Sequence, residues 1–403
     1  MIKIKLHWQI LIALFLGVIY GIYFTDYVNY ISWMGDLFLR ALKMIIVPLI
    51  LSSIISGVTN IGNAENLGRL GLKTISYYIT TSIFAIVTGL VLVNLIRPGA
   101  GADLGFSENV EGLLIARESF GSTLLNIIPT NIFTAFVEGN MLSIIFFSII
   151  FGFFITKTNT KHRIFLTDFF NSTFNVMMKI TMFIIRFTPY GVFGIVAFQV
   201  SRSSNILDLA QRLGIYMLVV IIGLFIHASI TLPLLTKIIG KVRPLKHFNN
   251  MSTPLLTAFS TSSSSATLPL TMEAVENKDG VSNKITSFTL PLGATINMDG
   301  TALYECVAAM FIAQAYGIEL GFTQQVIVVI TALLASIGAA GIPMAGLVMI
   351  TIILTAVGLP LEGVGLILAV DRILDMFRTA TNVWSDSCGA VIIAKSEGEK
   401  LKV

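Results

Sequence analysis

The stretch DRILDMFRTATNVWSD, residues 371–386, decides the fold class because it places several polar side chains within a long apolar segment. Intervals of four, three, four and four residues separate its polar members, Asp371, Asp375, Arg378, Asn382 and Asp386. On a helix with about 100° per residue, these side chains fall within an arc roughly 80° wide. The surrounding residues 364–394 are numerous and apolar enough to cross a bilayer.

The charges in this arc predict a ligand site inside a membrane. A charged side chain at the centre of a membrane helix costs about 2.5–3.5 kcal/mol on insertion scales. Four such side chains cost on the order of 10 kcal/mol, so the stripe must face protein or water. We expect it to hold a polar cargo at membrane depth.

The composition indicates a polytopic membrane protein. The 403 residues are 55% hydrophobic and only 12% charged, whereas soluble domains carry about 25% charged residues. The two cysteines, Cys306 and Cys388, lie in apolar segments and predict no disulfide framework. No nucleic-acid motif or long basic patch is present, so we expect no nucleic-acid partner.

The distribution of charge predicts the topology of the first half. Six apolar runs are long enough to span, at residues 8–24, 31–58, 74–96, 127–156, 164–198 and 209–238. Lysine and arginine residues precede the first run and occupy alternate links between runs. The charged residues of the link 98–129 are instead mostly acidic. By the positive-inside rule the N-terminus is cytoplasmic, and the lysines of the C-terminal tail place that end there too.

The second half contains two apolar segments that cannot be plain spanning helices. Pro254–Thr271 is rich in serine and threonine, and Ala335–Gly346 is rich in glycine and alanine. Each precedes a helix, near 284–314 or 362–394, with an amide and a carboxylate at its middle. Irregular backbone at membrane depth is tolerated where it lines a cavity, and broken segments at corresponding positions of two repeats point to a transporter's binding site. We therefore predict an all-α membrane protein with eight transmembrane helices and two re-entrant helical hairpins.

Arg378 and Asp375 predict the cargo. A guanidinium offers a planar fork of donors that suits a carboxylate, and a carboxylate can accept an ammonium. Together they match an acidic amino acid, with the backbone amides and hydroxyls of the serine-rich tip available for its α-carboxylate. The alternative is a structural ion pair between helices.

Other polar residues favour a cation and a proton. Asn297, Asp299, Asn382 and Asp386 supply oxygen ligands that suit a hard monovalent ion better than zinc, and the alternative is a hydrogen-bonded polar core. Burial disfavours the charged form of a lone carboxyl, so Glu305 is a candidate proton carrier, or else an inert core residue.

Two further groups have an ordinary structural interpretation on their own. Tyr78, Thr81 and Ser82 form a hydroxyl cluster that by itself indicates helix packing. His227 lies in an apolar run and is expected to be a core histidine rather than a ligand.

Four motifs carry a resemblance to a known family: SSSSATLP (262–269), TLPLGATINMDGTALYE (289–305), ASIGAAGIPMAG (335–346) and residues 371–386. They resemble the glutamate/aspartate:cation symporter family, which includes archaeal aspartate transporters and animal excitatory amino-acid transporters. The resemblance covers the whole chain in hydropathy and is most specific from residue 255 onward.

The resemblance implies a homotrimer that works by an elevator mechanism. The chain 1–403 would be a single transporter unit in the plasma or inner membrane. A scaffold part would comprise residues 1–73 and 127–210, approximately. A transport part would comprise about 74–96 and 211–403, with hairpins near 250–280 and 323–358.

The resemblance also implies the site residues. The substrate pocket would use Ser262, Ser263, Ser264, Met298, Thr301, Asp375, Arg378, Thr379 and Asn382, with Gly341, Ile342, Pro343, Ala345 and Gly346 as the closing gate. One sodium site would use Gly293, Asn297, Asn382 and Asp386. A second would use carbonyls of Thr295, Ser336, Ile337 and Ala339. A third would use Tyr78, Thr81, Ser82, Asn297 and Asp299.

The chain departs from the family pattern at one arginine. Archaeal members carry it at the hairpin position held here by Ser262, and animal members at the position held by Met376. Arg372, one turn away, is the candidate replacement. Glu305 matches the position linked to proton carriage, and the missing arginine argues against potassium counter-transport.

We therefore expect a secondary symporter for L-aspartate or L-glutamate, driven by sodium, with a proton as a further coupling ion and no cofactor. The carboxylate at Asp386 favours sodium, and a purely proton-coupled symporter is the alternative. The chain is not expected to be an enzyme. An intramembrane hydrolase could pair Asp299 with Asp386, but it has no use for the asparagines, the arginine or the hairpins, and a passive channel has no use for the Arg–Asp pair.

Overall fold

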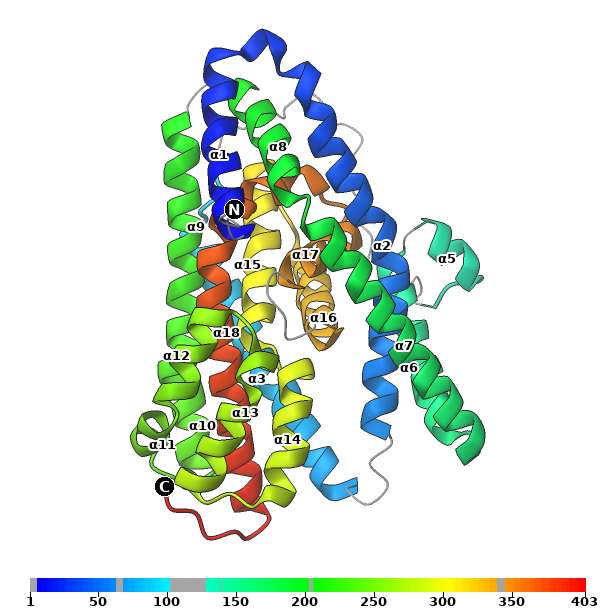
Figure 1. Ribbon diagram of the computed structural model, residues 1–403, viewed down its shortest axis with the longest axis vertical. Helices are drawn as coiled ribbons and strands as arrows, with labels where there is room; N and C mark the ends of the chain where they lie inside the picture. The colour runs from blue at the N-terminus through cyan, green and yellow to red at the C-terminus, as the bar shows by residue number, and fades with distance from the viewer. Residues whose placement is uncertain (1–5, 63–67, 102–127, 139, 203–205, 339–344) are drawn as a thin grey trace, which may run out of the picture.

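The structure, a computed structural model, describes residues 6–62, 68–101, 128–138, 140–202, 206–338 and 345–403. Within these ranges every regular element is a helix, as Figure 1 shows. Several of these helices are long and apolar enough to cross a membrane. The all-helical fold class predicted from the sequence is thus confirmed.

One group of helices packs around α2, which runs along one side of the molecule in Figure 1. α2 contacts α6, α7 and α8, and α8 lies along α1. The members of this group are α1 (Leu6–Tyr23), a 3-10 turn η1 (Thr25–Tyr27), α2 (Asn29–Gly62), α5 (Ile132–Glu138), α6 (Met141–Lys157), α7 (Thr160–Ile185) and α8 (Thr188–Arg202).

A second group packs around α15 and α18. Its first members are α3 (Gly68–Ile96), α9 (Ile206–Ile226), the π-helix η3 (His227–Thr231), α10 (Leu232–Ile238), α11 (Pro244–Asn250), α12 (Ser252–Thr261), α13 (Ser264–Glu273) and the π-helix η4 (Ala274–Asp279). The remaining members are α14 (Asn283–Ile296), α15 (Asp299–Ala315), α16 (Phe322–Gly338), α17 (Ala345–Ala356), η5 (Leu361–Gly363) and α18 (Val364–Ser396). α16 and α17 also contact α2, which joins the two groups.

Two of the six predicted apolar runs are divided in the structure. The run 127–156 contains α5 and α6, and the Asn140 side chain caps α6 by accepting the Ser143 amide. The run 164–198 contains α7 and α8, which meet at an angle of 52°. Pro189 stands at the start of α8, where its missing N–H costs nothing, and this favours a new helix over continuation of α7.

Helix length and hydropathy identify three unbroken candidate membrane spans among the described residues, at 29–59, 69–96 and 210–238. The bent pair α7 and α8 makes a fourth if it is counted as one span. Helices α12 to α17 of the second half lie outside this count because each has 17 residues or fewer.

The predicted helix near 284–314 is broken at Asn297 and Met298. Asn297 has φ −93° and ψ 81°, and Met298 has φ −113° and ψ 59°, so neither residue is helical. The break exposes the last carbonyls of α14 and the first amides of α15, which need partners from outside their own helices. Asp299 places a carboxylate in the first turn of α15, where the helix dipole favours negative charge.

The serine-rich segment forms a pair of contacting helices, α12 and α13, with a tight tip. Ser262 adopts a left-handed conformation, with φ 52° and ψ 39°, which is uncommon for a residue other than glycine. Ser263 then caps α13, since its hydroxyl accepts the Ala266 amide at 3.2 Å. The corresponding pair in the last third is α16 and α17, which also contact each other.

Candidate functional site

Arg378 lies at the centre of a buried polar group on α18. Its Nη2 atom is 2.8 Å from Asp375 Oδ1 and 3.2 Å from Asp371 Oδ1. The guanidinium stands over the ring of Tyr304, with 3.8 Å between Cζ and the ring centroid. The Tyr304 hydroxyl donates to Asp371 at 2.6 Å. These contacts hold the guanidinium plane in one orientation.

Part of the Arg378 guanidinium has donors to spare. Within the described part of the chain, Nε and Nη1 have no hydrogen-bond partner, although Arg378 is only 1% exposed. The absence of a side chain at Gly346 leaves room for the Arg378 Nη1 atom. A Cβ atom added at Gly346 would lie only 2.8 Å from this Nη1 atom. A buried cation with two unused donating atoms can bind a carboxylate.

Glu305 lies on α15 and is fully buried. Neither of its carboxyl oxygens has a hydrogen-bond partner among the described residues, and the positive charge of Arg378 acts on it electrostatically. An uncompensated buried charge is costly. The arrangement therefore suits a carboxyl that exchanges a proton.

The tip between α12 and α13 lies against α18, because both helices contact it and Phe259 packs edge-on against Phe377. Ser262, Ser263 and Ser264 are all buried. Among the described residues the Ser262 hydroxyl has no hydrogen-bond partner. The predicted serine tip is therefore a buried loop followed by a helix N-terminus, which favours an anion.

Asn382 bridges α18 and the start of α15. Its Oδ1 atom accepts the Gly300 amide at 2.8 Å, and its Nδ2 atom donates to the Thr301 hydroxyl at 3.1 Å. The side chain therefore caps the break rather than reaching Asn297 or Asp386 by a hydrogen bond. Thr379 and Met298, also predicted here, are both buried.

The first predicted cation set comes together at Asp386. Asn297 Nδ2 donates to Asp386 Oδ1 at 2.9 Å. Gly293 packs closely against the Asp386 carboxylate, because a Cβ atom added at Gly293 would collide with it. The same added Cβ atom would lie 2.8 Å from the Tyr78 hydroxyl. The Tyr78 hydroxyl itself donates to the Thr289 carbonyl at 2.7 Å.

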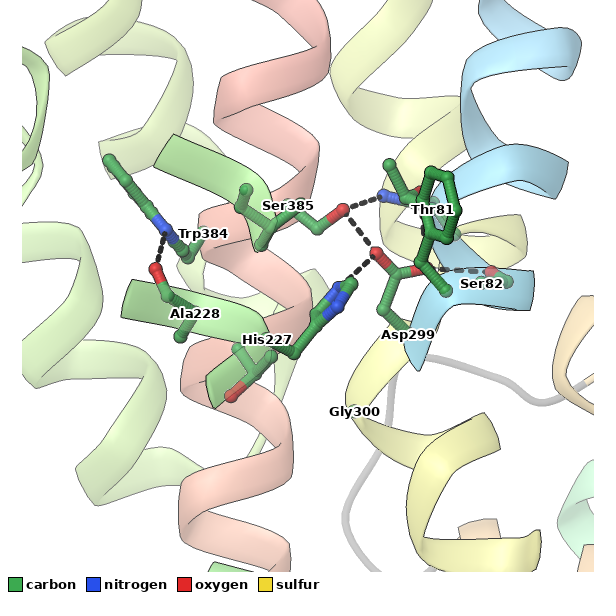
Figure 2. Close-up of polar contacts among 12 residues, drawn as sticks. Thr81, Ser82, His227, Ala228, Asp299, Gly300, Trp384 and Ser385 are labelled. Carbon is green, nitrogen blue, oxygen red and sulfur yellow. Dashed lines mark hydrogen bonds and ion pairs between the residues drawn. The ribbon is translucent and has the colours of Figure 1, made fainter. Parts of the chain in front are cut away.

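Thr81 and Ser82 of the third predicted set lie beside Asp299, as Figure 2 shows. Ser82 donates to Asp299 Oδ1 at 2.6 Å. The Thr81 hydroxyl is 3.3 Å from the same oxygen and 3.4 Å from Asn297 Oδ1. α3 therefore brings its hydroxyl cluster to the break between α14 and α15, which a simple helix-packing role would not require.

The second predicted set is only partly described. Thr295 lies at the C-terminal end of α14, while Ser336 and Ile337 lie at the C-terminal end of α16, and the two helices contact each other. Free carbonyls at such ends favour cations. Ala339 lies outside the described residues, as do the predicted gate residues Gly341, Ile342 and Pro343, and Ala345 begins α17.

The sequence analysis gave no individual binding or positioning role to four residues of this site. Tyr304 and Asp371 hold Arg378 in place. Of these two, only Asp371 could have been found from the sequence, because it lies on the polar arc. Ser385 donates to Asp299 Oδ2 at 2.6 Å, and His227 Nε2 lies 3.0 Å from the same oxygen. His227 is a core histidine, as expected, but its partner is a predicted cation ligand.

Arg372 does not join the buried group. Its Nη1 atom is 3.6 Å from Asp375 Oδ2, and its side chain is 26% exposed. It therefore borders the Arg378 cluster from outside, and its role as a replacement for the missing arginine stays a prediction.

In the described ranges, no three or more His, Cys, Asp or Glu side chains gather as a zinc site would require. The oxygens that do gather come from amides, hydroxyls and single carboxylates.

Residues 6–396 match the model of the sodium:dicarboxylate symporter family. The chain belongs to this family. Symporters move solutes and are not enzymes, so the expectation of a non-enzymatic protein is confirmed.

Several curated members of the family are similar over nearly the whole chain. The proton/glutamate-aspartate symporter of Escherichia coli is 37% identical and covers 98% of this chain and 94% of its own length. Human excitatory amino acid transporter 3 is 37% identical, with 99% and 87% covered. The proton/sodium-glutamate symport protein of Geobacillus stearothermophilus is 37% identical, with 98% and 96% covered. The family resemblance drawn from four motifs is thus confirmed.

Proposed function

We propose that the protein is a secondary symporter that takes up L-aspartate or L-glutamate with sodium ions. The observation that carries this proposal is the buried Arg378, two of whose donating atoms have no hydrogen-bond partner among the described residues. On the same helix, Asp386 lies in a cluster of amide, hydroxyl and carboxylate groups. The similar proteins named above carry glutamate or aspartate, sodium and protons in their names.

The substrate would span α18 and the tip between α12 and α13. Arg378 binds the side-chain carboxylate, and Asp375 binds the α-amino group. The tip at Ser262–Ser264 receives the α-carboxylate through hydroxyls and the amides of α13. Thr301, Thr379 and Asn382 complete the pocket with Met298, and the segment Gly341–Gly346 closes it.

Sodium would bind at three places around the break in the second half of the chain. The first is formed by Gly293, Asn297, Asn382 and Asp386. The second is formed by carbonyls of Thr295, Ser336, Ile337 and Ala339. The third is formed by Tyr78, Thr81, Ser82, Asn297 and Asp299. The contact of Asp386 with Asn297 supports the first site. The contacts of Ser82 with Asp299 and of Thr81 with Asn297 support the third.

Glu305 would carry a proton with the substrate. Its two oxygens have no partner among the described residues, which supports a carboxyl that is neutral when buried. The purely proton-coupled symporter is the second candidate, and the same observation favours it. The oxygen clusters at Asp386 and Asp299 favour sodium over it.

The architecture we propose has eight spans and two re-entrant hairpins in a homotrimer, with both termini cytoplasmic, in the plasma or inner membrane. The helices around α2 correspond to the scaffold part, at about 1–73 and 127–210. The helices around α15 and α18 correspond to the transport part, at about 74–96 and 211–403. Elevator movement of the second part against the first is supported by the packing of each group on itself, with fewer elements in contact between them.

Uptake into proteoliposomes tests the function. Labelled aspartate is offered with an inward sodium gradient, an inward proton gradient, or neither. We expect concentrative uptake with the sodium gradient and a further increase when the proton gradient is added. Uptake driven by protons alone would transfer the proposal to the second candidate, and uptake that never exceeds equilibration would contradict a symporter.

A further inference from the structure

The two carboxylate oxygens of Asp299 face different partners, as Figure 2 shows. Oδ1 faces α3, where it accepts the Ser82 hydroxyl at 2.6 Å and lies 3.3 Å from the Thr81 hydroxyl. Oδ2 faces the other way, toward Ser385 Oγ at 2.6 Å and His227 Nε2 at 3.0 Å. All five side chains are buried.

His227 reaches Asp299 from a widened helical turn. Residues 227–231 form a π-helix, in which the Leu232 amide donates to the His227 carbonyl. Pro233 follows, and it has no N–H and would crowd the carbonyl four residues earlier in a regular helix. The π-turn relieves this clash and is a feature often found at functional sites. Since a carboxylate only accepts, His227 Nε2 carries the proton of this contact.

Ser385 connects two ligand side chains with one hydroxyl. The hydroxyl donates to Asp299 Oδ2 and accepts Asn297 Nδ2 at 3.0 Å. The directions are fixed because an amide nitrogen only donates and a carboxylate only accepts. Asn297 Nδ2 also donates to Asp386 Oδ1 at 2.9 Å, so both amide hydrogens of Asn297 have partners.

This arrangement determines which oxygens reach α3. With its nitrogen held by Ser385 and Asp386, the Asn297 amide must point its oxygen toward the Thr81 hydroxyl, 3.4 Å away. With Oδ2 held by Ser385 and His227, Asp299 must point Oδ1 toward the same hydroxyl. Ser385 therefore orients both ligand oxygens at once.

We propose that Ser385 is a positioning residue of the cation site on α3, and that with His227 it makes Asp299 a ligand through a single oxygen. The inference rests on the proposed function, because it assumes that sodium binds between Thr81, Ser82, Asn297 and Asp299. Ser385 itself acts through those ligands. Partners of metal ligands typically change affinity by about 10- to 100-fold when removed.

The test is the sodium concentration that half-saturates aspartate binding to the purified, full-length protein. Ser385→Ala removes both hydrogen bonds, so we expect this concentration to rise about tenfold or more. Aspartate affinity at saturating sodium should stay close to that of the unmutated protein, because Ser385 does not contact the Arg378 group. Ser385→Thr keeps a hydroxyl and should restore most of the sodium affinity.

Ser387→Ala is the matched control on the same helix. The Ser387 hydroxyl is equally buried, but it donates to the Trp384 carbonyl and contacts His247 instead of a ligand. We expect its sodium half-saturation to equal that of the unmutated protein. If Ser385→Ala does not purify as folded protein, Ser385→Gly removes the same hydroxyl and carries the same test.

Three results are decisive against the inference. An unchanged sodium half-saturation in the folded Ser385 variant overturns it while leaving sodium coupling intact. An equal shift in the Ser385 and Ser387 variants shows a general packing effect and also overturns it. Aspartate binding by the unmutated protein that ignores sodium overturns the proposed function first, and the positioning role with it.

Discussion

The Arg378 group and the Asp299 group lie in the same part of the molecule, but their polar atoms are satisfied differently. Around Arg378, two guanidinium atoms and both oxygens of Glu305 have no hydrogen-bond partner in the described part of the chain. Around Asp299, both carboxylate oxygens have partners, and so do both hydrogens of the Asn297 amide.

This difference indicates two kinds of binding. An anion can bind the spare donors of Arg378 without breaking an internal hydrogen bond. A cation at Asp299 must first turn the Ser82 hydroxyl away, because this hydroxyl now donates to the carboxylate and would have to offer a lone pair instead. The Thr81 hydroxyl lies closest to the Tyr77 carbonyl of its own helix, at 3.1 Å. We therefore expect strong selection at the first group and weak, adjustable affinity at the second.

Asn382 connects the two groups. Its side chain binds Gly300 and Thr301, which directly follow Asp299 and also border the Arg378 group. A cation that orders the start of α15 would therefore also order part of the proposed substrate pocket. Coupling of this kind is reciprocal, so each ligand should raise the affinity for the other.

Arg378→Ala should have the largest effect. Loss of a buried charged partner costs about 3–5 kcal/mol, which is roughly two to three and a half decades in affinity. We expect aspartate and glutamate binding to fall by that amount in isothermal calorimetry, with a gain in binding of a neutral amino acid such as serine. Arg372→Ala, on the exposed side of Asp375, should cost much less. Unchanged aspartate affinity in the folded Arg378 variant would remove it from the pocket.

Asp386→Asn should act on the sodium dependence. The substitution keeps the shape of the side chain but removes the charge that accepts Asn297. We expect the sodium half-saturation of aspartate binding to rise at least about tenfold. A variant that keeps its sodium half-saturation but loses aspartate affinity at saturating sodium would reverse the roles of the two groups.

Glu305→Gln should separate the proton from sodium. Glutamine has the shape of the neutral acid, so sodium-dependent binding should persist. The response of uptake to an imposed pH gradient should disappear. The measurement is uptake at fixed sodium in vesicles with and without the gradient, for both proteins. If the unmutated protein ignores the gradient, Glu305 is a structural core residue and the protein is a sodium-only symporter.

Glu397→Gln should have the smallest effect, because this carboxylate lies beyond the end of α18. Lys73 and Arg69 donate to it at 2.7 and 2.6 Å, and these bonds lower the pKa of Glu397 below its usual 4.5. A lowered pKa stabilises the fold above pH 4.5 and loses this contribution as the pH falls through the lowered value.

The variant should therefore melt at most about 2 °C below the unmutated protein at pH 7. The difference between the two proteins should shrink on acidification. A difference that grows at low pH would contradict the ion pairs.

The sequence predicted the polar arc of α18 correctly, because a period of 3.6 residues together with the cost of buried charge leaves little freedom. Asp371, Asp375, Arg378, Asn382 and Asp386 are all buried in one helix. The break at Asn297 was not predicted, since the flanking residues are apolar enough for one continuous span and tertiary partners such as Asn382 stabilise the interruption.

Contacts between residues that are distant in sequence could not be predicted from the sequence either. The Tyr304 ring contacts Arg378 because α15 packs on α18, and no local sequence pattern predicts this packing. His227 depends on a π-turn before Pro233, and Ser385 gave no signal of its own beside Asp386. The division of residues 164–198 into α7 and α8 was not predicted, because hydropathy does not show where the axis of a helix changes direction.

The most direct test of sodium coupling is the aspartate dissociation constant of the unmutated protein, measured at several sodium concentrations with choline as the replacement ion. We predict that affinity rises steeply with sodium, because cation and substrate order the same start of α15. A flat curve would rule out sodium coupling and make the proton the driving ion.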